Sequence, residues 1–275
     1  MLVQLPVRLV RYGVARDLWK VPMVQQWRLY TNLATDSGSV SYLRSTRTGV
    51  EIYLVGTAHV SQKSAEEVYQ VIHQVIPETV AVELCPERAK KLMAGEQNET
   101  QTFLRSLAEL LQAPGGVGQK VVNFAFKSIY AMLRNTGLEP GKEFKVACEE
   151  AQKLGAKLLY IDQDYRVTIQ RVVEVMTYKD VFRLLTSQGG LPPELRQEFE
   201  SGSFEEALEK VKTRENVRAV VKSVEALFPN LVKVMIHERD KLMVERLREC
   251  TGKVVGVVGM AHMDGIERLW KELES

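Results

Sequence analysis

Four mostly apolar runs, separated by longer stretches with helical periodicity, set the pattern of this chain. The runs cover residues 50–55, 79–84, 157–161 and 253–258. Each run is short and rich in aliphatic residues, as expected for strands that are buried on both faces of a sheet. Between the runs, apolar residues recur at every third or fourth position, which predicts helices. The alternation predicts an α/β fold with a central parallel or mixed sheet and flanking helices.

The first run is expected to enter the sheet through a hairpin and to leave it through a helix. Residues 40–43 and 50–55 flank an Arg-Thr-Gly turn, a pattern typical of two antiparallel strands. The helix that follows can be capped by Ser61 or Ser64 and ends before Pro77. Because the next run comes directly after this helix, the two runs are predicted to be parallel, with a right-handed crossover.

A long helical stretch interrupts the alternation before the last run. We therefore predict one α/β domain at residues 41–275, with a helical subdomain at about residues 165–249 and a closing helix at 266–273. Residues 113–118 are Gly-rich but lack the Lys-Ser/Thr pair of a phosphate loop, so they are interpreted as a hinge. Residues 121–133 predict a strongly apolar helix, too short to cross a bilayer, that forms part of the core or the wall of a groove.

The first forty residues differ from the rest of the chain in charge. Basic residues outnumber acidic residues there, and aliphatic residues are interleaved with them. An acid-poor, Arg-bearing amphipathic start is typical of a mitochondrial targeting segment. The alternative is an ordinary basic N-terminal arm, residues 1–40, that packs on the domain. The protein is accordingly expected to be intracellular, either cytoplasmic or mitochondrial.

Overall charge and cysteine content narrow the class of protein further. The formal net charge of +2 at pH 7 gives no indication of nucleic acid as a partner. The cysteines Cys85, Cys148 and Cys250 form no CxxC pair, so a reducing compartment is expected and a disulfide framework is not. No apolar run approaches the length of a membrane span. Membrane association would use an anchor outside these residues or a contact other than a spanning helix.

The strongest functional signal is a Gly-x-Ala-His pattern at the end of two of the runs. It ends in His59 after the first run and in His262 after the last, and Glu83 lies at the end of the second run. The glycine is expected to let the backbone turn sharply, at the sheet edge where α/β proteins bind ligands. Two imidazoles and one carboxylate there predict a site for a divalent metal such as Mn²⁺, Co²⁺ or Zn²⁺. The alternative is that each histidine lies at a strand end and makes ordinary hydrogen bonds.

Other polar residues give weaker signals. Asp162 or Asp164, after the third run, is a candidate for a further ligand, a general base or an acceptor for an imidazole N–H. Arg239 lies in an apolar helix, where an inward guanidinium group needs an acidic partner or an anionic ligand. His73 and His237 lie within predicted helices, away from the strand ends. Both are interpreted as structural or surface residues.

Several of these segments resemble the TraB/PrgY family, which is also grouped with GumN and the TIKI proteins. The residues that carry the resemblance are 54–61 (LVGTAHVS), 80–88 (VAVELCPER), 141–157 (GKEFKVACEEAQKLGAK), 161–171 (IDQDYRVTIQR), 237–243 (HERDKLM) and 257–266 (VVGMAHMDGI). Eukaryotic TraB-domain proteins look most similar. The resemblance implies an α/β domain like that of erythromycin-esterase-like and haem-binding ChaN-like proteins. One departure is Gln163, which stands where relatives often have Arg.

The resemblance also implies a function for the strand ends. TIKI relatives are regarded as metal-dependent proteases with two Gly-x-x-His motifs and an acidic residue, which correspond to His59, His262 and Glu83. By the same match, four further residues are implied to line the pocket: Glu143, Asp162, Arg171 and Arg239. The chain is therefore expected to be a metal-dependent, peptidase-like hydrolase that acts on a peptide or a small molecule. Arg239 and Arg171 would orient the carboxylates or the substrate.

A non-catalytic binding module, or a membrane-associated regulatory module, is the alternative function. It would hold a peptide, haem or a lipid headgroup in the same pocket and use residues 121–133 as a docking surface. Three features favour it: the absence of an obvious nucleophile, Gln163 in place of Arg, and the basic residues in the first forty positions. An exposed apolar face on residues 121–133 would support this alternative, and burial of that face would contradict it.

Overall fold

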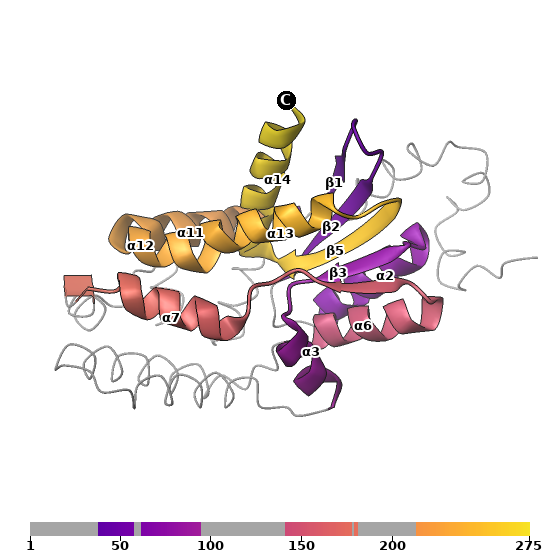
Figure 1. Ribbon diagram of the computed structural model, residues 1–275, viewed down its shortest axis with the longest axis horizontal. Coiled ribbons are helices and arrows are strands. Elements are labelled where there is room, and N and C mark those ends of the chain that lie inside the picture. The colour runs from indigo at the N-terminus through magenta and orange to yellow at the C-terminus, as the bar shows by residue number, and fades with distance from the viewer. Residues whose placement is uncertain (1–37, 58–61, 95–140, 178, 181–212) are drawn as a thin grey trace, which may run out of the picture.

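The computed structural model of the chain describes residues 38–57, 62–94, 141–177, 179–180 and 213–275 (Figure 1). Several predictions fall on residues outside these ranges: the basic arm before residue 38, the hinge at 113–118, the apolar helix at 121–133 and His59. These stay predictions, and so does the docking surface that depends on residues 121–133.

A five-stranded mixed sheet forms the centre of the described structure. Its strands are β1 (Val40–Arg44), β2 (Glu51–Thr57), β3 (Thr79–Val82), β4 (Lys157–Tyr160) and β5 (Lys253–Gly259). The spatial order is β1-β2-β5-β3-β4. β1 pairs with β2 in antiparallel orientation, and the other pairs are parallel. The predicted hairpin and the predicted common sheet are both confirmed.

The last strand of the sequence lies in the middle of this sheet. On one side β5 pairs with β2, in a register that places Gly259 opposite Thr57. On the other side it pairs with β3, and Val257 lies opposite Val82. Because the three strands run in the same direction, their carboxyl ends meet at one edge. The residues that follow each strand are therefore brought to the same place.

Helices make up most of the remaining described chain. They are α2 (Gln62–Val75), α3 (Pro86–Met93), α6 (Lys142–Leu154), α7 (Tyr165–Val175), α11 (Arg214–Leu227), α12 (Pro229–Val232), the π-helix η3 (Lys233–His237), α13 (Glu238–Arg248) and α14 (Met260–Glu274). The described part of the predicted helical subdomain is helical apart from short connections. Of the helices within the described ranges, none combines the length and the apolar character that a membrane crossing requires.

Helices cover both faces of the sheet (Figure 1). Val55, Val82 and Val257 belong to a core cluster that includes residues of α2 and α6. On the opposite face, Ile52 and Val254 belong to a second cluster with residues of α13 and α14. Neighbouring residues of a strand point to opposite faces, and both faces are buried here. This explains why the strand runs are apolar at nearly every position and do not alternate.

Two helix boundaries differ from those predicted. α2 begins at Gln62, so Ser64 lies inside the helix and is buried, and the prediction that Ser64 caps this helix is wrong. α14 begins at Met260, directly after β5 and before the predicted start at residue 266. The chain thus passes from strand to helix without a loop. As a result His262 lies in the first turn of α14, where the helix backbone fixes its position.

The glycines of the two Gly-x-Ala-His patterns do not make the sharp turn that was predicted. Gly56 lies within β2, and neither Gly56 nor Gly259 is among the residues with positive φ. A Cβ atom on Gly56 would lie 2.0 Å from Sδ of Met263. Glycine at this position lets the side chain of Met263, from α14, pack directly against β2.

Candidate functional site

Three of the predicted site residues converge at the carboxyl edge of the sheet. Glu83 follows β3, Asp162 follows β4, and His262 follows β5 in the first turn of α14. All three are buried, with between 4% and 5% of each residue exposed. Arg239, from α13, reaches into the same place and forms ion pairs with both carboxylates. The result is a buried ionic cluster of Glu83, Asp162, Arg239 and His262, and Asp240 belongs to it through its contact with His262.

Glu83 has a partner for each oxygen of its carboxylate. Oε2 accepts a hydrogen bond of 2.6 Å from the backbone N–H of Gly259, which is the N-cap residue of α14. Oε1 accepts a hydrogen bond from Arg239 Nη2 and lies 3.2 Å from Nε2 of His262. The start of a helix favours a negative charge. The direct passage from β5 into α14 therefore helps to hold the buried carboxylate.

His262 lies between two carboxylates. Its Nδ1 atom is 2.6 Å from Oδ1 of Asp240, and its Nε2 atom faces Glu83. Burial alone would lower the pKa of His262, but the carboxylates of Glu83 and Asp240 outweigh that effect and raise the pKa to about 9. The two carboxylates therefore favour the protonated imidazole, whose Nδ1 hydrogen-bonds to Asp240 and whose Nε2 forms an ion pair with Glu83.

Arg239 binds two carboxylates with one guanidinium group. Nε is 2.8 Å from Oδ1 of Asp162, Nη2 is 3.0 Å from Oδ2 of the same residue, and Nη2 also reaches Glu83. Nη1 donates to the backbone carbonyl of Met235 at 3.0 Å. Burial works to lower the pKa of Arg239, but Glu83 and Asp162 raise it above its ordinary value. The predicted acidic partner of this inward arginine is thus confirmed as a pair of carboxylates.

Asp240 belongs to the site, although the sequence analysis did not single it out. It is completely buried, with 0% exposed. Burial raises the pKa of Asp240, and the hydrogen bond with His262 opposes that shift. A signal was present in the sequence: Asp240 stands at spacings of three and seven from Met243 and Leu247, on the core-facing side of α13. A carboxylate in such an apolar stripe needs a buried partner.

Two arginines elsewhere in the chain supply positive charge near Asp162, although residue 163 is not an arginine. Gln163 contributes its backbone N–H to Oδ1 of Asp162 at 2.8 Å. Arg88 Nη1 lies 3.6 Å from Oδ2, and Arg246 donates to the backbone carbonyl of Asp162 at 2.8 Å. The absence of arginine at position 163 therefore does not leave this end of β4 without positive charge. Arg88 and Arg246 had not been predicted as site residues.

Three other candidate residues are not members of the ionic cluster. Arg171 forms an ion pair of 2.9 Å with Glu238, the residue before Arg239, so its link to the cluster is indirect. Glu143 is buried in the first turn of α6, with 1% exposed. Asp164 caps α7 by accepting the backbone N–H of Arg166 at 2.8 Å. The roles predicted for Arg171 and Glu143 stay predictions.

His73 and His237 pair with carboxylates outside the ionic cluster, and the cysteines are buried. His73 pairs with Glu150 at 2.7 Å, and His237 pairs with Glu225 at 2.9 Å. The three cysteines are free and buried. Burial raises the pKa of Cys148 to about 11 and also raises the pKa of Cys250. Cys148 and Cys250 are therefore poor nucleophiles at neutral pH.

Two of the three predicted metal ligands, His262 and Glu83, lie within the described ranges. His262 Nε2 and Glu83 Oε1 are 3.2 Å apart, which is the separation expected for two ligand atoms that each lie about 2.1 Å from one ion. Their nitrogen and oxygen donors suit Zn²⁺, Co²⁺ or Mn²⁺. No group of three or more His, Cys, Asp or Glu side chains within the described ranges is arranged to hold a metal ion. The third predicted ligand, His59, lies outside those ranges.

The fold and the site together define an α/β protein with a His–carboxylate–Arg cluster at the carboxyl edge of a mixed sheet. The chain belongs to the TraB/PrgY/gumN family, whose family model matches residues 42–275. An uncharacterized protein of Methanocaldococcus jannaschii is 33% identical, over 82% of this chain and 54% of its own length. The TraB domain-containing protein of Homo sapiens is 28% identical, over 81% of this chain and 63% of its own length. The chain thus spans about half to two thirds of the length of these relatives.

Proposed function

We propose that this chain is a metal-dependent hydrolase of the peptidase type, with its site at the carboxyl edge of the sheet. The observation that supports the proposal is the pairing of His262 Nε2 with Glu83 Oε1 at 3.2 Å, while the other imidazole nitrogen binds Asp240. A metal-binding histidine usually donates its second ring N–H to a carboxylate, a backbone carbonyl or water. His262 and Glu83 would hold the cation, and His59 is the proposed third ligand.

The residues of the ionic cluster have separate roles in this proposal. A divalent cation, when bound, would polarise a substrate carbonyl and lower the pKa of a bound water. Asp240 keeps a proton on Nδ1 of His262, so that Nε2 is the nitrogen available for binding. His262 has to lose its Nε2 proton before it can serve as a ligand. Arg239 holds the carboxylates of Glu83 and Asp162 in fixed orientation and balances their charge.

Calorimetric titration of the metal-free protein with Mn²⁺, Co²⁺ and Zn²⁺ tests the metal site. The double variant His59→Ala with His262→Ala should lose at least about a hundredfold in affinity, because two of three ligands are gone. Its circular dichroism spectrum should remain native. His73→Ala is the matched control, since His73 pairs with Glu150 and not with the cluster. Unchanged metal affinity in the double variant would overturn the proposed site.

Hydrolysis itself needs a separate measurement. A peptide library should be cleaved by the wild-type protein with added metal, and cleavage should stop when the metal is chelated or when Glu83 is replaced by Gln. Glu143→Gln and Arg171→Met test the two predicted residues whose roles the described contacts leave undetermined. Tight metal binding without cleavage of any library would reject the hydrolase and favour the binding module.

A further inference from the structure

The segment that carries Asp162 leaves the sheet at its edge. Among the described strands, β4 is the outermost on this side of the sheet, and it ends at Tyr160, two residues before Asp162. The backbone hydrogen bonds to the neighbouring chain lengthen here, from 3.0 Å for the N–H of Ile161 to 3.4 Å for that of Asp162. The backbone groups of an edge strand need partners from outside the sheet. The position of Asp162 therefore depends on contacts with other elements.

Arg246, from α13, binds the backbone of this segment. Its Nη1 atom donates to the carbonyl of Tyr160 at 3.1 Å and to that of Asp162 at 2.8 Å. One nitrogen can serve two carbonyls because it carries two N–H groups. Two residues later, Asp164 caps α7. The short connection around Asp162 is thus held on one side by Arg246 and on the other by the start of α7.

Arg239 and Arg246 lie on one side of α13, since a separation of seven residues is close to two turns of an α-helix. Arg239 binds the carboxylate of Asp162 through Nε at 2.8 Å and through Nη2 at 3.0 Å. Arg246 binds the backbone of the same residue. The helix α13 therefore holds Asp162 at two places. Where the Asp162 carboxylate lies relative to Arg239 depends on the backbone contact that Arg246 makes.

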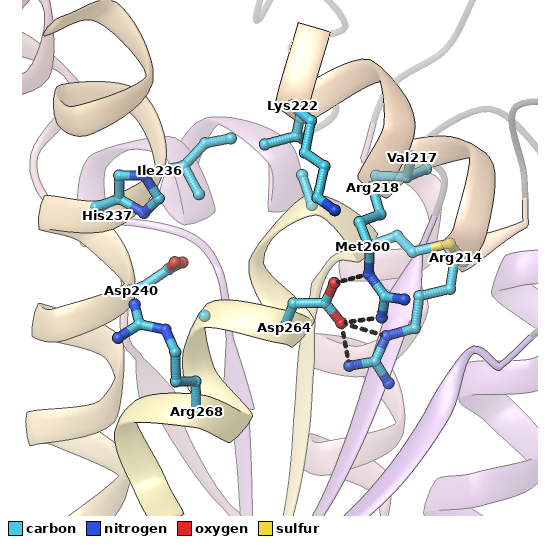
Figure 2. A pocket seen from close by; sticks show the side chains of 13 residues that line it. Arg214, Val217, Arg218, Lys222, Ile236, His237, Asp240, Met260, Asp264 and Arg268 are labelled. Atoms are coloured by element: carbon cyan, nitrogen blue, oxygen red, sulfur yellow. Dashed lines mark hydrogen bonds and ion pairs between the residues drawn. The ribbon is translucent and has the colours of Figure 1, made fainter. Parts of the chain in front are cut away.

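α13 is itself anchored on α14 and on the sheet. Asp240 contacts His262 at 2.6 Å, and Figure 2 shows Asp240 directed from α13 toward α14, beside a cavity of about 200 Å³ that these helices form with α11 and η3. Met243 and Leu247 are completely buried and belong to the core cluster on this face of the sheet. Both arginines therefore extend from a helix whose position is fixed.

We propose that Arg246 is a positioning residue of the ionic cluster. It acts through Asp162: by holding the backbone of that residue, it keeps the carboxylate within reach of Nε and Nη2 of Arg239. Arg239 Nη2 also binds Glu83, so the orientation of the guanidinium group toward Glu83 depends on the same contact. The consequence for a bound metal rests on the proposed function, whereas the effect on the cluster does not.

Hydrogen exchange of the Arg239 Nε–H measures this role in the metal-free full chain. A buried Nε–H that donates to a carboxylate exchanges slowly with water and can be followed in ¹H–¹⁵N spectra. Arg246→Met should raise its exchange rate at least tenfold, because the Asp162 carboxylate is then free to move away from Nε. The backbone N–H groups of β2 and β5 should keep their wild-type protection, which a general loss of structure would not allow.

Two further variants make the result specific. Arg246→Lys carries an ammonium group that can donate to the same carbonyls, and its exchange rate should stay within threefold of wild type. Arg248→Met is the matched control, because Arg248 lies on the same helix and pairs with Glu274 at 2.8 Å; it should leave the exchange rate unchanged. Unchanged protection in Arg246→Met, or an equal loss in Arg248→Met, would overturn the proposal. Should Arg246→Met fail to fold, Arg246→Lys decides: retained protection supports the role, and lost protection contradicts it.

Titration with Mn²⁺ separates this role from the proposed function. Where the wild-type protein binds Mn²⁺, Arg246→Met should bind it at least tenfold more weakly than Arg248→Met does, because Glu83 is one of the proposed ligands. A wild-type protein that binds no Mn²⁺ would count against the metal site alone. The exchange rates of the Arg239 Nε–H would still decide the role of Arg246.

Discussion

Arg239 allows two carboxylates to be buried side by side. Glu83 and Asp162 are each about 5% exposed or less, and the planar guanidinium group contacts both. Their position could be predicted, because the carboxyl ends of parallel strands meet at one edge. The contact of Asp240 with His262 could not, since it depends on how α13 packs against α14. The sequence therefore predicts the position of residues that directly follow strands. It does not predict which residues of a helix reach the site.

Removal of the Arg239 guanidinium group should destabilise the protein strongly. Arg239→Met leaves two buried carboxylates without their cation, so the free energy of unfolding at pH 7 should fall by about 3–5 kcal/mol. Urea denaturation followed by circular dichroism measures the loss.

Arg268→Met is the control for that measurement. Arg268 pairs with Glu272 on the surface of α14, and its side chain is 55% exposed. Its replacement should change the free energy of unfolding by less than about 0.5 kcal/mol. A loss below 1 kcal/mol in the Arg239 variant would mean that the cluster relaxes or takes in water when the cation is absent.

His262 should make the stability of the metal-free protein depend on pH. Its pKa rises from 6.5 to about 9 on folding, so the stabilisation is complete below pH 6.5 and is lost as the pH rises through 9. The loss is on the order of 3 kcal/mol. The free energy of unfolding should therefore fall between pH 6.5 and 9 in the wild-type protein, and fall less in His262→Gln. A wild-type slope in the His262 variant would contradict the assignment.

At the scale of elements, the close approach of α13 and α14 fixes the ionic cluster. The helical period of α13 and its apolar stripe could be read from the sequence. The direct start of α14 at Met260 could not, because Ala261 and His262 continue a pattern that is equally compatible with a loop. At this start the carboxylate of Glu83 accepts the backbone N–H of Gly259. A residue distant in sequence thus contributes to the N-terminus of this helix.

Gly265→Ala tests the contact between these two helices. A Cβ at this position would lie 1.8 Å from Oδ2 and 2.7 Å from Cγ of Asp240. Alanine normally stabilises a helix relative to glycine by about 0.5–1 kcal/mol, but here overpacking should destabilise the protein by about 1–3 kcal/mol. Thermal and urea denaturation give the sign. Lys271→Ala, on the exposed side of α14, should be nearly neutral, and a stabilised Gly265 variant would show that the helices can separate.

At the scale of the whole molecule, the class of fold could be predicted and the strand order could not. Short apolar runs between helical stretches identify an α/β sheet with a hairpin at one side. Nothing local in the sequence places β5 between β2 and β3, because each run is apolar on both faces and is compatible with any interior position. The order depends on long-range packing, in which β5 contributes to the core clusters on both faces.

The central place of β5 has a consequence for the synthesis of the protein. While the ribosome is still making residues 213–252, β2 and β3 lack the strand that joins them, and each presents an open edge to other chains. The nascent chain must therefore wait for β5 before these strands can join, a long-range step of the kind that slows folding. His262 follows that strand. A nascent chain that ends before residue 262 therefore cannot assemble the cluster, so any chemistry at this edge begins only after β5 and the first turn of α14 have been made.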